Sequence, residues 1–185
     1  MTSYETLADI ELFQRMNSGC EESFVALYRR LSPQVYRFAL RMCGSTGIAD
    51  EVTQEVFLLL LNGKATYDPA RAPLGAWLLG VARNCALRVL DRDGRYLSVE
   101  DSVGEPVAED NILAELTREE SVESLRSAVL ALPPRYREVV VLCDLEELSY
   151  QQAAAVLGCA MGTVRSRLHR ARALLVDKLK VRVGT

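Results

Sequence analysis

Four arginines near the end of the chain have the residue type and the spacing to bind a polyanion. Arg165, Arg167, Arg170 and Arg172 lie two or three residues apart in a segment that predicts a helix over about 161–180. A guanidinium group donates two parallel hydrogen bonds to a phosphate or to the edge of a guanine base. Further candidates on this segment are Thr163, Ser166 and His169. The pattern predicts a helix that lies in the major groove of DNA.

The same segment has an apolar side. At 100° per residue, one narrow sector is expected to face inward and holds Val164, Leu168, Ala171 and Leu175. The alternative interpretation is an ordinary solvated arginine face, supported by ion pairs within the helix. Asp177 is the only acidic residue after Met161, so most of those pairs are missing. The sequence therefore favours contact with DNA.

A second candidate site is acidic. A predicted helix over about 48–61 carries Asp50, Glu51, Gln54 and Glu55 on its outer side. Glu51 and Glu55 are like charges one helical turn apart, which is mildly destabilising, and no Lys or Arg lies nearby in sequence. A partner with a basic surface would explain this pattern. The alternative is an exposed acidic face near a helix N-terminus, where the macrodipole favours carboxylates.

The cysteines and the histidine do not form a recognisable site. The five cysteines are widely scattered, none forms a C-x-x-C pair, and His169 is the only histidine. A zinc site or a disulfide framework therefore has little support, and small buried thiols are the simpler interpretation. Because the sequence shows no Ser/His or Cys/His combination that could act as a nucleophile and its general base, we predict that the protein has no enzyme activity. We also predict no cofactor and no metal.

Charge is distributed unevenly along the 185 residues. Residues 1–92 carry equal numbers of acidic and basic groups, residues 93–124 carry ten acidic and two basic groups, and residues 133–185 have a basic excess. The acidic stretch also has the Ser, Gly and Pro content of a linker. We therefore predict two modules joined by a flexible acidic linker, with the basic module placed to meet a polyanion.

Apolar residues recur at helical spacing along both modules, and no stretch alternates as a strand would. The predicted fold is all-α, with two small helical bundles. Helices are expected near 7–17, 24–43, 48–61, 74–92, 112–130, 135–145, 149–157 and 161–180. The longest apolar run is six residues, which is too short to span a bilayer, and no secretory signal is visible. We expect a cytoplasmic protein with no direct membrane insertion.

The last two predicted helices form a helix-turn-helix. Ser149 and Gln152 have the spacing of a capping box, in which each side chain binds the other residue's backbone amide. Gly158 is suited to the left-handed residue that ends a helix, and a new helix begins a few residues later. Two helices joined by so tight a turn are typical of a DNA-binding module.

Four segments in order carry a family resemblance. They are ADEVTQEVF (49–57), GAWLLGVARN (75–84), LPPRYRE (132–138) and GTVRSRLHRAR (162–172). Together they resemble the extracytoplasmic-function (ECF) group of sigma-70 transcription initiation factors over about residues 8–180. The resemblance implies sigma region 2 in residues 1–94, a linker in 95–118 and sigma region 4 in 119–185.

The resemblance also implies roles for individual residues. The helix that carries Asp50, Glu51, Gln54, Glu55 and Phe57 would bind core RNA polymerase. The loop at 64–73 and the helix after it would capture the −10 promoter element as a single strand, through Lys64, Tyr67, Arg71, Arg83, Asn84 and Arg88. Trp77 is expected in the core. The helix with Thr163, Arg165, Ser166, Arg167, His169, Arg170 and Arg172 would read the −35 element.

This chain departs from the family pattern at several positions, and two of them, 88 and 91, bear on the −10 site. Family members commonly carry Asp where this chain has Arg88, and Arg where it has Asp91. The swap either preserves an internal pair or alters readout of the −10 element. The implied function is a specificity subunit that brings core polymerase to promoters and helps to melt them, regulated by an anti-sigma protein. The alternative is a stand-alone helix-turn-helix regulator that binds operator DNA.

Overall fold

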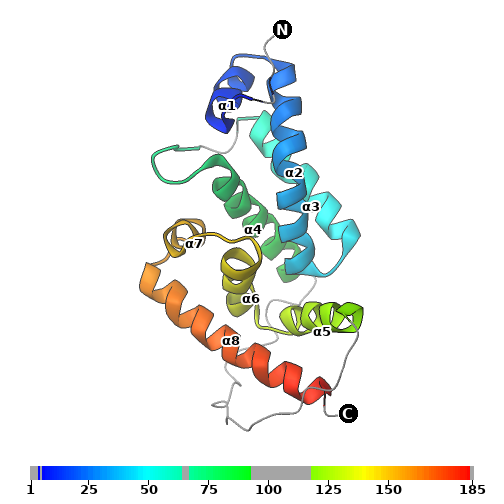
Figure 1. The fold of residues 1–185 in the computed structure, drawn as a ribbon. Coiled ribbons are helices and arrows are strands. Elements are labelled where there is room, and N and C mark those ends of the chain that lie inside the picture. Colours follow the sequence, from blue (N-terminus) through cyan, green and yellow to red (C-terminus); the bar gives the residue numbers. More distant parts are fainter. Residues whose placement is uncertain (1–3, 5, 64–66, 93–117, 184–185) are drawn as a thin grey trace.

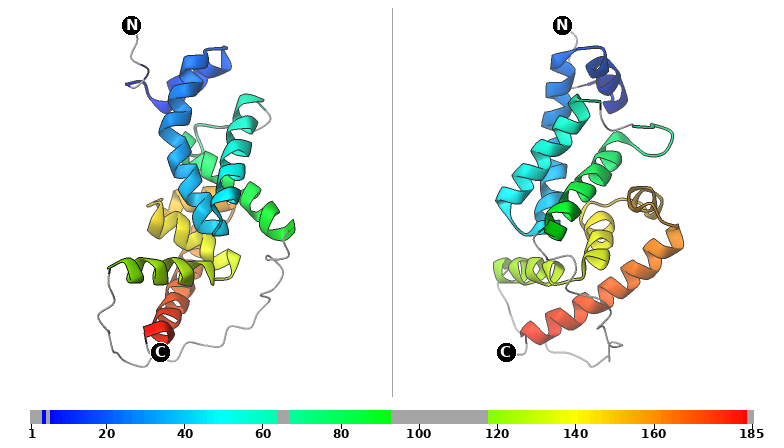
Figure 2. Two further views of the ribbon diagram at one scale, coloured as in Figure 1. Left: turned by 90° about the vertical axis from the view of Figure 1, so that its right-hand side faces the viewer. Right: turned by 180° about the vertical axis from the view of Figure 1, so that it is seen from behind.

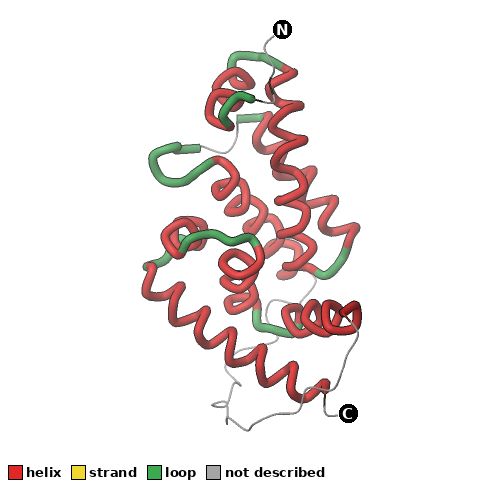
Figure 3. Tube along the Cα trace, viewed as in Figure 1, coloured by secondary structure: helices red, strands yellow, loops and turns green. Residues whose placement is uncertain are grey.

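The computed structural model describes residues 4, 6–63, 67–92 and 118–183. In the N-terminal module, helices α1 (Asp9–Asn17), α2 (Glu21–Cys43), α3 (Thr46–Leu61) and α4 (Leu74–Arg92) pack together. The described part of the chain contains helices and connecting loops without a strand, as Figure 3 shows. The predicted all-α fold is confirmed. The predicted acidic linker lies outside the described residues, apart from the start of the helix that follows it.

The C-terminal module contains α5 (Arg118–Leu130), α6 (Pro134–Val140), a π-helical turn η1 (Val141–Leu145), α7 (Tyr150–Leu157) and α8 (Met161–Val183). One helix was expected over 135–145, but the structure widens its last turn into η1. The amide of Glu146 donates to the carbonyl of Val141, five residues back. The chain then reverses through Glu147, whose φ is +57°.

The predicted helix-turn-helix is present in α7 and α8. The hydroxyl of Ser149 accepts from the amide of Gln152 at 3.2 Å, and the Gln152 side chain accepts from the amide of Ser149 at 2.9 Å. Gly158 ends α7 with a φ of +63°, in the left-handed region that favours glycine. The capping box and the glycine turn are therefore confirmed.

The two modules pack directly against each other. In Figures 1 and 2, α7 lies beside α4, while α5, α6 and η1 contact α2. Buried residues of both modules belong to one continuous hydrophobic cluster, from Leu27 and Leu78 to Leu142 and Leu168. The sequence predicted that a linker joins the two modules. It did not predict the broad noncovalent contact between them.

The ends of α2 and α5 approach closely beside this contact. Gly44 follows α2 with a φ of +73°, and a Cβ atom built there would lie 2.9 Å from the Leu130 side chain. Any larger residue would meet both the strained backbone and this leucine. The glycine therefore allows α5 to pack against the end of α2.

All five cysteines are free thiols; Cys43 and Cys85 are buried and the other three are partly buried. Burial, with a smaller contribution from the neighbouring Asp144 carboxylate, raises the pKa of Cys143 from about 9 to about 11. The thiolate is the reactive form, so its fraction at pH 8 falls about 100-fold.

We expect iodoacetamide to alkylate Cys143 in the native chain at pH 8 about 100 times more slowly than in urea. The native rate should rise about tenfold for each pH unit above 8 and level off above about pH 11. Peptide mapping by mass spectrometry over a pH series measures this. Equal rates in the native and unfolded chains would contradict the buried environment.

Among the residues that the structure describes, no helix is both long and apolar enough to cross a membrane. The same residues contain no group of three or more His, Cys, Asp and Glu side chains placed to hold a metal ion.

Candidate nucleic-acid and partner interfaces

The acidic face predicted on α3 is accessible. Asp50, Glu51 and Gln54 are exposed, and Glu55 is half-buried. Ser45 caps the helix by accepting from the amide of Ile48; the first turn of α3 holds no acidic residue, and the carboxylates follow in the second and third turns. Glu51, Gln54 and Glu55 line a groove between α3 and α4. This face can bind a basic surface.

Arg88 lies on the other side of the same groove. Its Nη2 atom donates to Oε1 of Glu55 at 2.7 Å. The structure therefore brings one residue predicted for DNA next to one predicted for the protein partner. Asp91 is exposed near the end of α4, and the ion pair of Arg88 is with α3. The departure from the family pattern at position 88 creates a link between helices.

Phe57 differs from the other residues predicted on α3. It is 3% exposed, and its ring packs against Tyr28 with centroids 4.8 Å apart and more distantly against Phe24. These rings attach α3 to α2. In this arrangement Phe57 positions the acidic face and is not part of its surface.

The loop before α4 is held by aromatic packing. Tyr67 packs edge-on against Phe13, with centroids 5.1 Å apart, and its ring lies 5.4 Å from that of Trp77. Burial raises the pKa of Tyr67, and its protonated hydroxyl donates to the carbonyl of Ala72 at 3.1 Å. Tyr67 and Trp77 are both half-buried. Lys64 lies outside the described residues.

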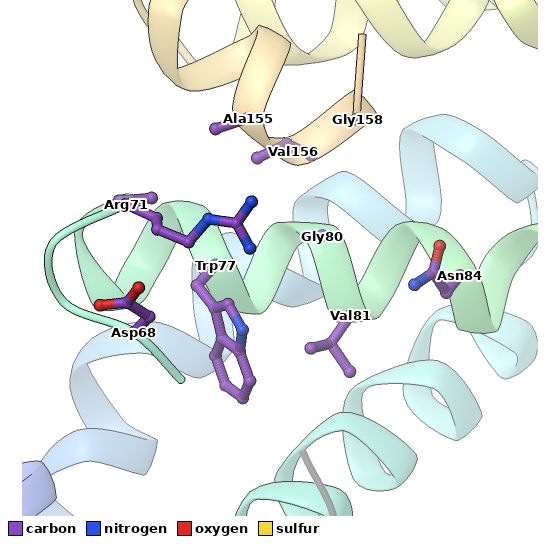
Figure 4. A pocket seen from close by; sticks show the side chains of 10 residues that line it. Asp68, Arg71, Trp77, Gly80, Val81, Asn84, Ala155, Val156 and Gly158 are labelled. Carbon is purple, nitrogen blue, oxygen red and sulfur yellow. The ribbon is translucent and has the colours of Figure 1, made fainter. Parts of the chain in front are cut away.

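A pocket of about 380 Å³ lies between this loop, α4 and α7. Figure 4 shows Arg71, Trp77 and Asn84 on the side of the N-terminal module, with Val156 opposite them on α7. An aromatic ring, a guanidinium and an amide are groups that stack on and hydrogen-bond to an unpaired base. Two predicted residues of the −10 site, Arg71 and Asn84, thus line one pocket, and Tyr67 packs against Trp77 of its lining, but α7 covers part of the site.

Arg83, another predicted −10 residue, points into the C-terminal module. Its Nε atom donates to Glu138 of α6 at 2.7 Å, and Arg167 of α8 donates to the same carboxylate at 3.4 Å. The Glu138 side chain is only 3% exposed. One buried carboxylate therefore holds one arginine from each predicted DNA site.

The predicted inward face of α8 is confirmed. It is buried and holds Val164, Leu168, Ala171 and Leu175. Four predicted −35 residues are exposed on the other side: Arg165, Ser166, His169 and Arg172. Thr163, Arg167 and Arg170 are half-buried, and the Ser166 hydroxyl donates to the carbonyl of Thr163 at 3.1 Å.

Residues outside α8 orient its arginines. The guanidinium of Arg165 lies over the ring of Tyr150, 5.8 Å from its centroid. Arg172 donates to both carboxylate oxygens of Asp144, at 2.6 and 3.1 Å. Asp144, Tyr150 and Glu138 were not expected from the sequence, because helical spacing points only to partners on the same helix. A signal in the sequence that could have found one of these partners is Glu138, a single acidic residue next to the apolar run 139–143.

Comparison with known proteins accounts for both modules. Residues 27–96 match the family model Sigma-70 region 2, and residues 122–175 match Sigma-70, region 4. The ECF RNA polymerase sigma factor EcfG of Rhodopseudomonas palustris (strain TIE-1) is 34% identical over 149 residues, covering 80% of this chain and 81% of EcfG. The chain belongs to the ECF RNA polymerase sigma factors.

Two further comparisons agree with this membership. The ECF RNA polymerase sigma factor SigE of Mycolicibacterium smegmatis is 35% identical over 160 residues, which cover 85% of this sigma factor and 62% of SigE. The chain thus spans about three-fifths of that relative's length. The sigma factor RpoE of Bartonella quintana, solved in complex with the anti-sigma factor NepR, has a TM-score of 0.65 at 27% identity, covering 86% of this chain and 98% of RpoE.

Family membership also decides between the alternatives left open by the sequence. The region 2 match lies in the N-terminal module, outside the helix-turn-helix. The match over both regions favours a transcription initiation factor over a stand-alone helix-turn-helix regulator.

Proposed function

We propose that this ECF sigma factor binds core RNA polymerase and directs it to promoters through their −10 and −35 elements. The main support is that an accessible acidic face on α3 and an arginine-bearing face on α8 lie in the segments that match regions 2 and 4. The first face is complementary to a basic protein surface, and the second to a DNA duplex.

Each predicted residue has a role in this proposal. Asp50, Glu51, Gln54 and Glu55 contact the polymerase, with Phe57 behind them. The loop before α4 and the face of α4 hold the melted −10 strand. The outer face of α8 reads the −35 element. The chemistry of RNA synthesis belongs to the polymerase, and the sigma factor adds no catalytic group of its own.

The proposal extends to domains, regulation and location. Residues 1–94 act as region 2, 95–118 as a linker and 119–185 as region 4. The RpoE structure contains an anti-sigma factor, which supports a regulator of the same kind for this chain. The sigma factor would work in the cytoplasm, where the polymerase transcribes, and a membrane-anchored anti-sigma protein would hold it at the membrane.

Run-off transcription with purified core polymerase on a promoter library tests the function. We expect transcripts only when both the sigma factor and the polymerase are present. Strong binding of the free chain to a duplex operator, without transcripts in the presence of polymerase, would contradict the proposal and favour a stand-alone regulator.

Replacing Arg165 with alanine tests readout of the −35 element. A bidentate contact with a base contributes about 1–3 kcal/mol, so promoter-dependent transcription should fall roughly 5- to 150-fold. Sequencing the transcribed library should show relaxed preference at one or two positions. Arg29→Ala, which removes an exposed arginine from α2, is the matched control. An equal loss for every promoter sequence would contradict base readout by Arg165.

A further inference from the structure

Two arginines on one side of α8 are held by residues of other elements. Arg165 and Arg172 are seven residues apart, so they lie on one line about two helical turns apart. The guanidinium of Arg165 lies over the ring of Tyr150, at the start of α7. Arg172 is bound by Asp144 of η1. The C-terminal module therefore supplies supports for two side chains that are predicted to meet DNA.

The Asp144 carboxylate binds one edge of the Arg172 guanidinium. The Nε atom of Arg172 donates to Oδ2 at 3.1 Å, and Nη2 donates to Oδ1 at 2.6 Å. Two parallel bonds fix the plane and the direction of a guanidinium, which a single contact does not. The Arg172 side chain is nevertheless 55% exposed. The arginine is therefore held in one direction at the surface without being covered.

Arg172 keeps a second edge for DNA. A guanidinium has five N–H donors, and Asp144 accepts from Nε and from one side of Nη2. The end of the guanidinium, formed by Nη1 and the other side of Nη2, still offers two parallel donors. Two such donors match two oxygens of a phosphate, or O6 and N7 of a guanine. Arg172 can thus bind Asp144 and DNA at the same time.

The π-helical turn places Asp144 for this contact. Val141 and Leu142 are fully buried and anchor η1 in the core. The turn is closed by the amide of Glu146, which donates to the carbonyl of Val141 at 2.9 Å. π-helical turns occur frequently at functional sites, and their additional residue changes the direction of the side chains around them. The position of Asp144 beside α8 therefore depends on η1 and on how it packs.

We propose that Asp144 is a positioning residue for readout of the −35 element and acts through Arg172. The inference rests on the proposed function. Asp144 directs the guanidinium to one place on the duplex, and its negative charge disfavours contacts of Arg172 with other phosphates. Without Asp144, the long arginine side chain would reach several phosphates, which carry no sequence information. Asp144 thus lowers the general affinity for DNA and raises the discrimination between sequences.

Replacing Asp144 with asparagine in the full chain tests both effects, because asparagine keeps the shape of the side chain but removes its charge. Binding to a fluorescein-labelled random-sequence duplex, measured by fluorescence anisotropy, should tighten about fivefold. The slope of log affinity against log salt concentration should steepen by about 0.9, the value for one more phosphate contact. In run-off transcription on the promoter library, the sequence preference that depends on Arg172 should fall at least about fivefold. The variant Arg172→Ala identifies the positions concerned.

Glu147→Gln is the matched control, because it removes an exposed carboxylate three residues farther along the chain. It should change neither the salt slope nor the sequence preference. In the Arg172→Ala background, Asp144→Asn should have no further effect on either quantity, since Asp144 acts through Arg172. An effect that persists in that background would overturn the proposal, because it would come from the fold or from net charge. Weaker or unchanged duplex binding by Asp144→Asn would also overturn it, and so would an unchanged sequence preference.

The two measurements distinguish failure of this inference from failure of the proposed function. If the wild-type chain does not transcribe with core polymerase, the proposed function fails. Duplex binding uses the chain alone, so it still decides whether Asp144 restrains Arg172. An unchanged affinity and salt slope in Asp144→Asn would then refute that restraint.

Discussion

Replacing Glu51 with lysine is expected to reduce binding of the sigma factor to core RNA polymerase at least about 100-fold. Glu51 is exposed at the centre of the acidic face on α3 and lines the groove beside Arg88. Charge reversal removes an attraction and adds a repulsion from the basic surface of the partner, and close charge pairs at interfaces couple by about 1.5–7 kcal/mol. Run-off transcription should fall with the binding.

Co-sedimentation with core polymerase at two salt concentrations measures this effect. Glu21→Lys makes the same charge change at the exposed start of α2, outside the groove, and serves as the control. Its affinity should stay within about twofold of wild type. Equal losses in the two variants would show that only net charge matters, and unchanged binding of Glu51→Lys would refute the polymerase site.

Arg137→Met is expected to lower the stability of the chain by about 3 kcal/mol. The Arg137 guanidinium donates to the carbonyls of Met42, Leu130 and Leu132. The first two lie in the last turns of α2 and α5, where carbonyls have no partner within the helix. Methionine would fill similar space but leave these acceptors unpaired. For a chain of this length, the melting temperature should fall by roughly 6–12 °C.

Circular dichroism at the helical band measures the melting temperature. Arg135→Met changes an exposed arginine two residues earlier on α6 and should shift it by less than about 2 °C. Equal shifts in the two variants would contradict a specific role for Arg137. Because Arg137 joins the ends of α2 and α5, we also expect its replacement to loosen the contact between the modules.

Much of the fold could be predicted because its signals are local. Helical spacing of apolar residues located α2, α3, α4 and α8 to within a few residues, and the inward face of α8 followed from 100° per residue. Ser149 and Gly158 identified the helix-turn-helix because caps act over three or four residues. Periodicity also placed the acidic face of α3 outward.

The sequence by itself therefore determined which segments are helical, which faces are apolar and which helices carry the acidic and arginine side chains. Only the tertiary structure decided which carboxylate pairs with each arginine. Arg83, Arg167 and Arg172 pair with Glu138 and Asp144, which lie 28 to 55 residues away along the chain. A helical repeat relates residues three or four positions apart, and it holds no information on which helices come together. Packing of α8 within the C-terminal module brings Arg167 and Arg172 to these carboxylates, and packing of the two modules brings Arg83 to Glu138 and α7 over the −10 pocket.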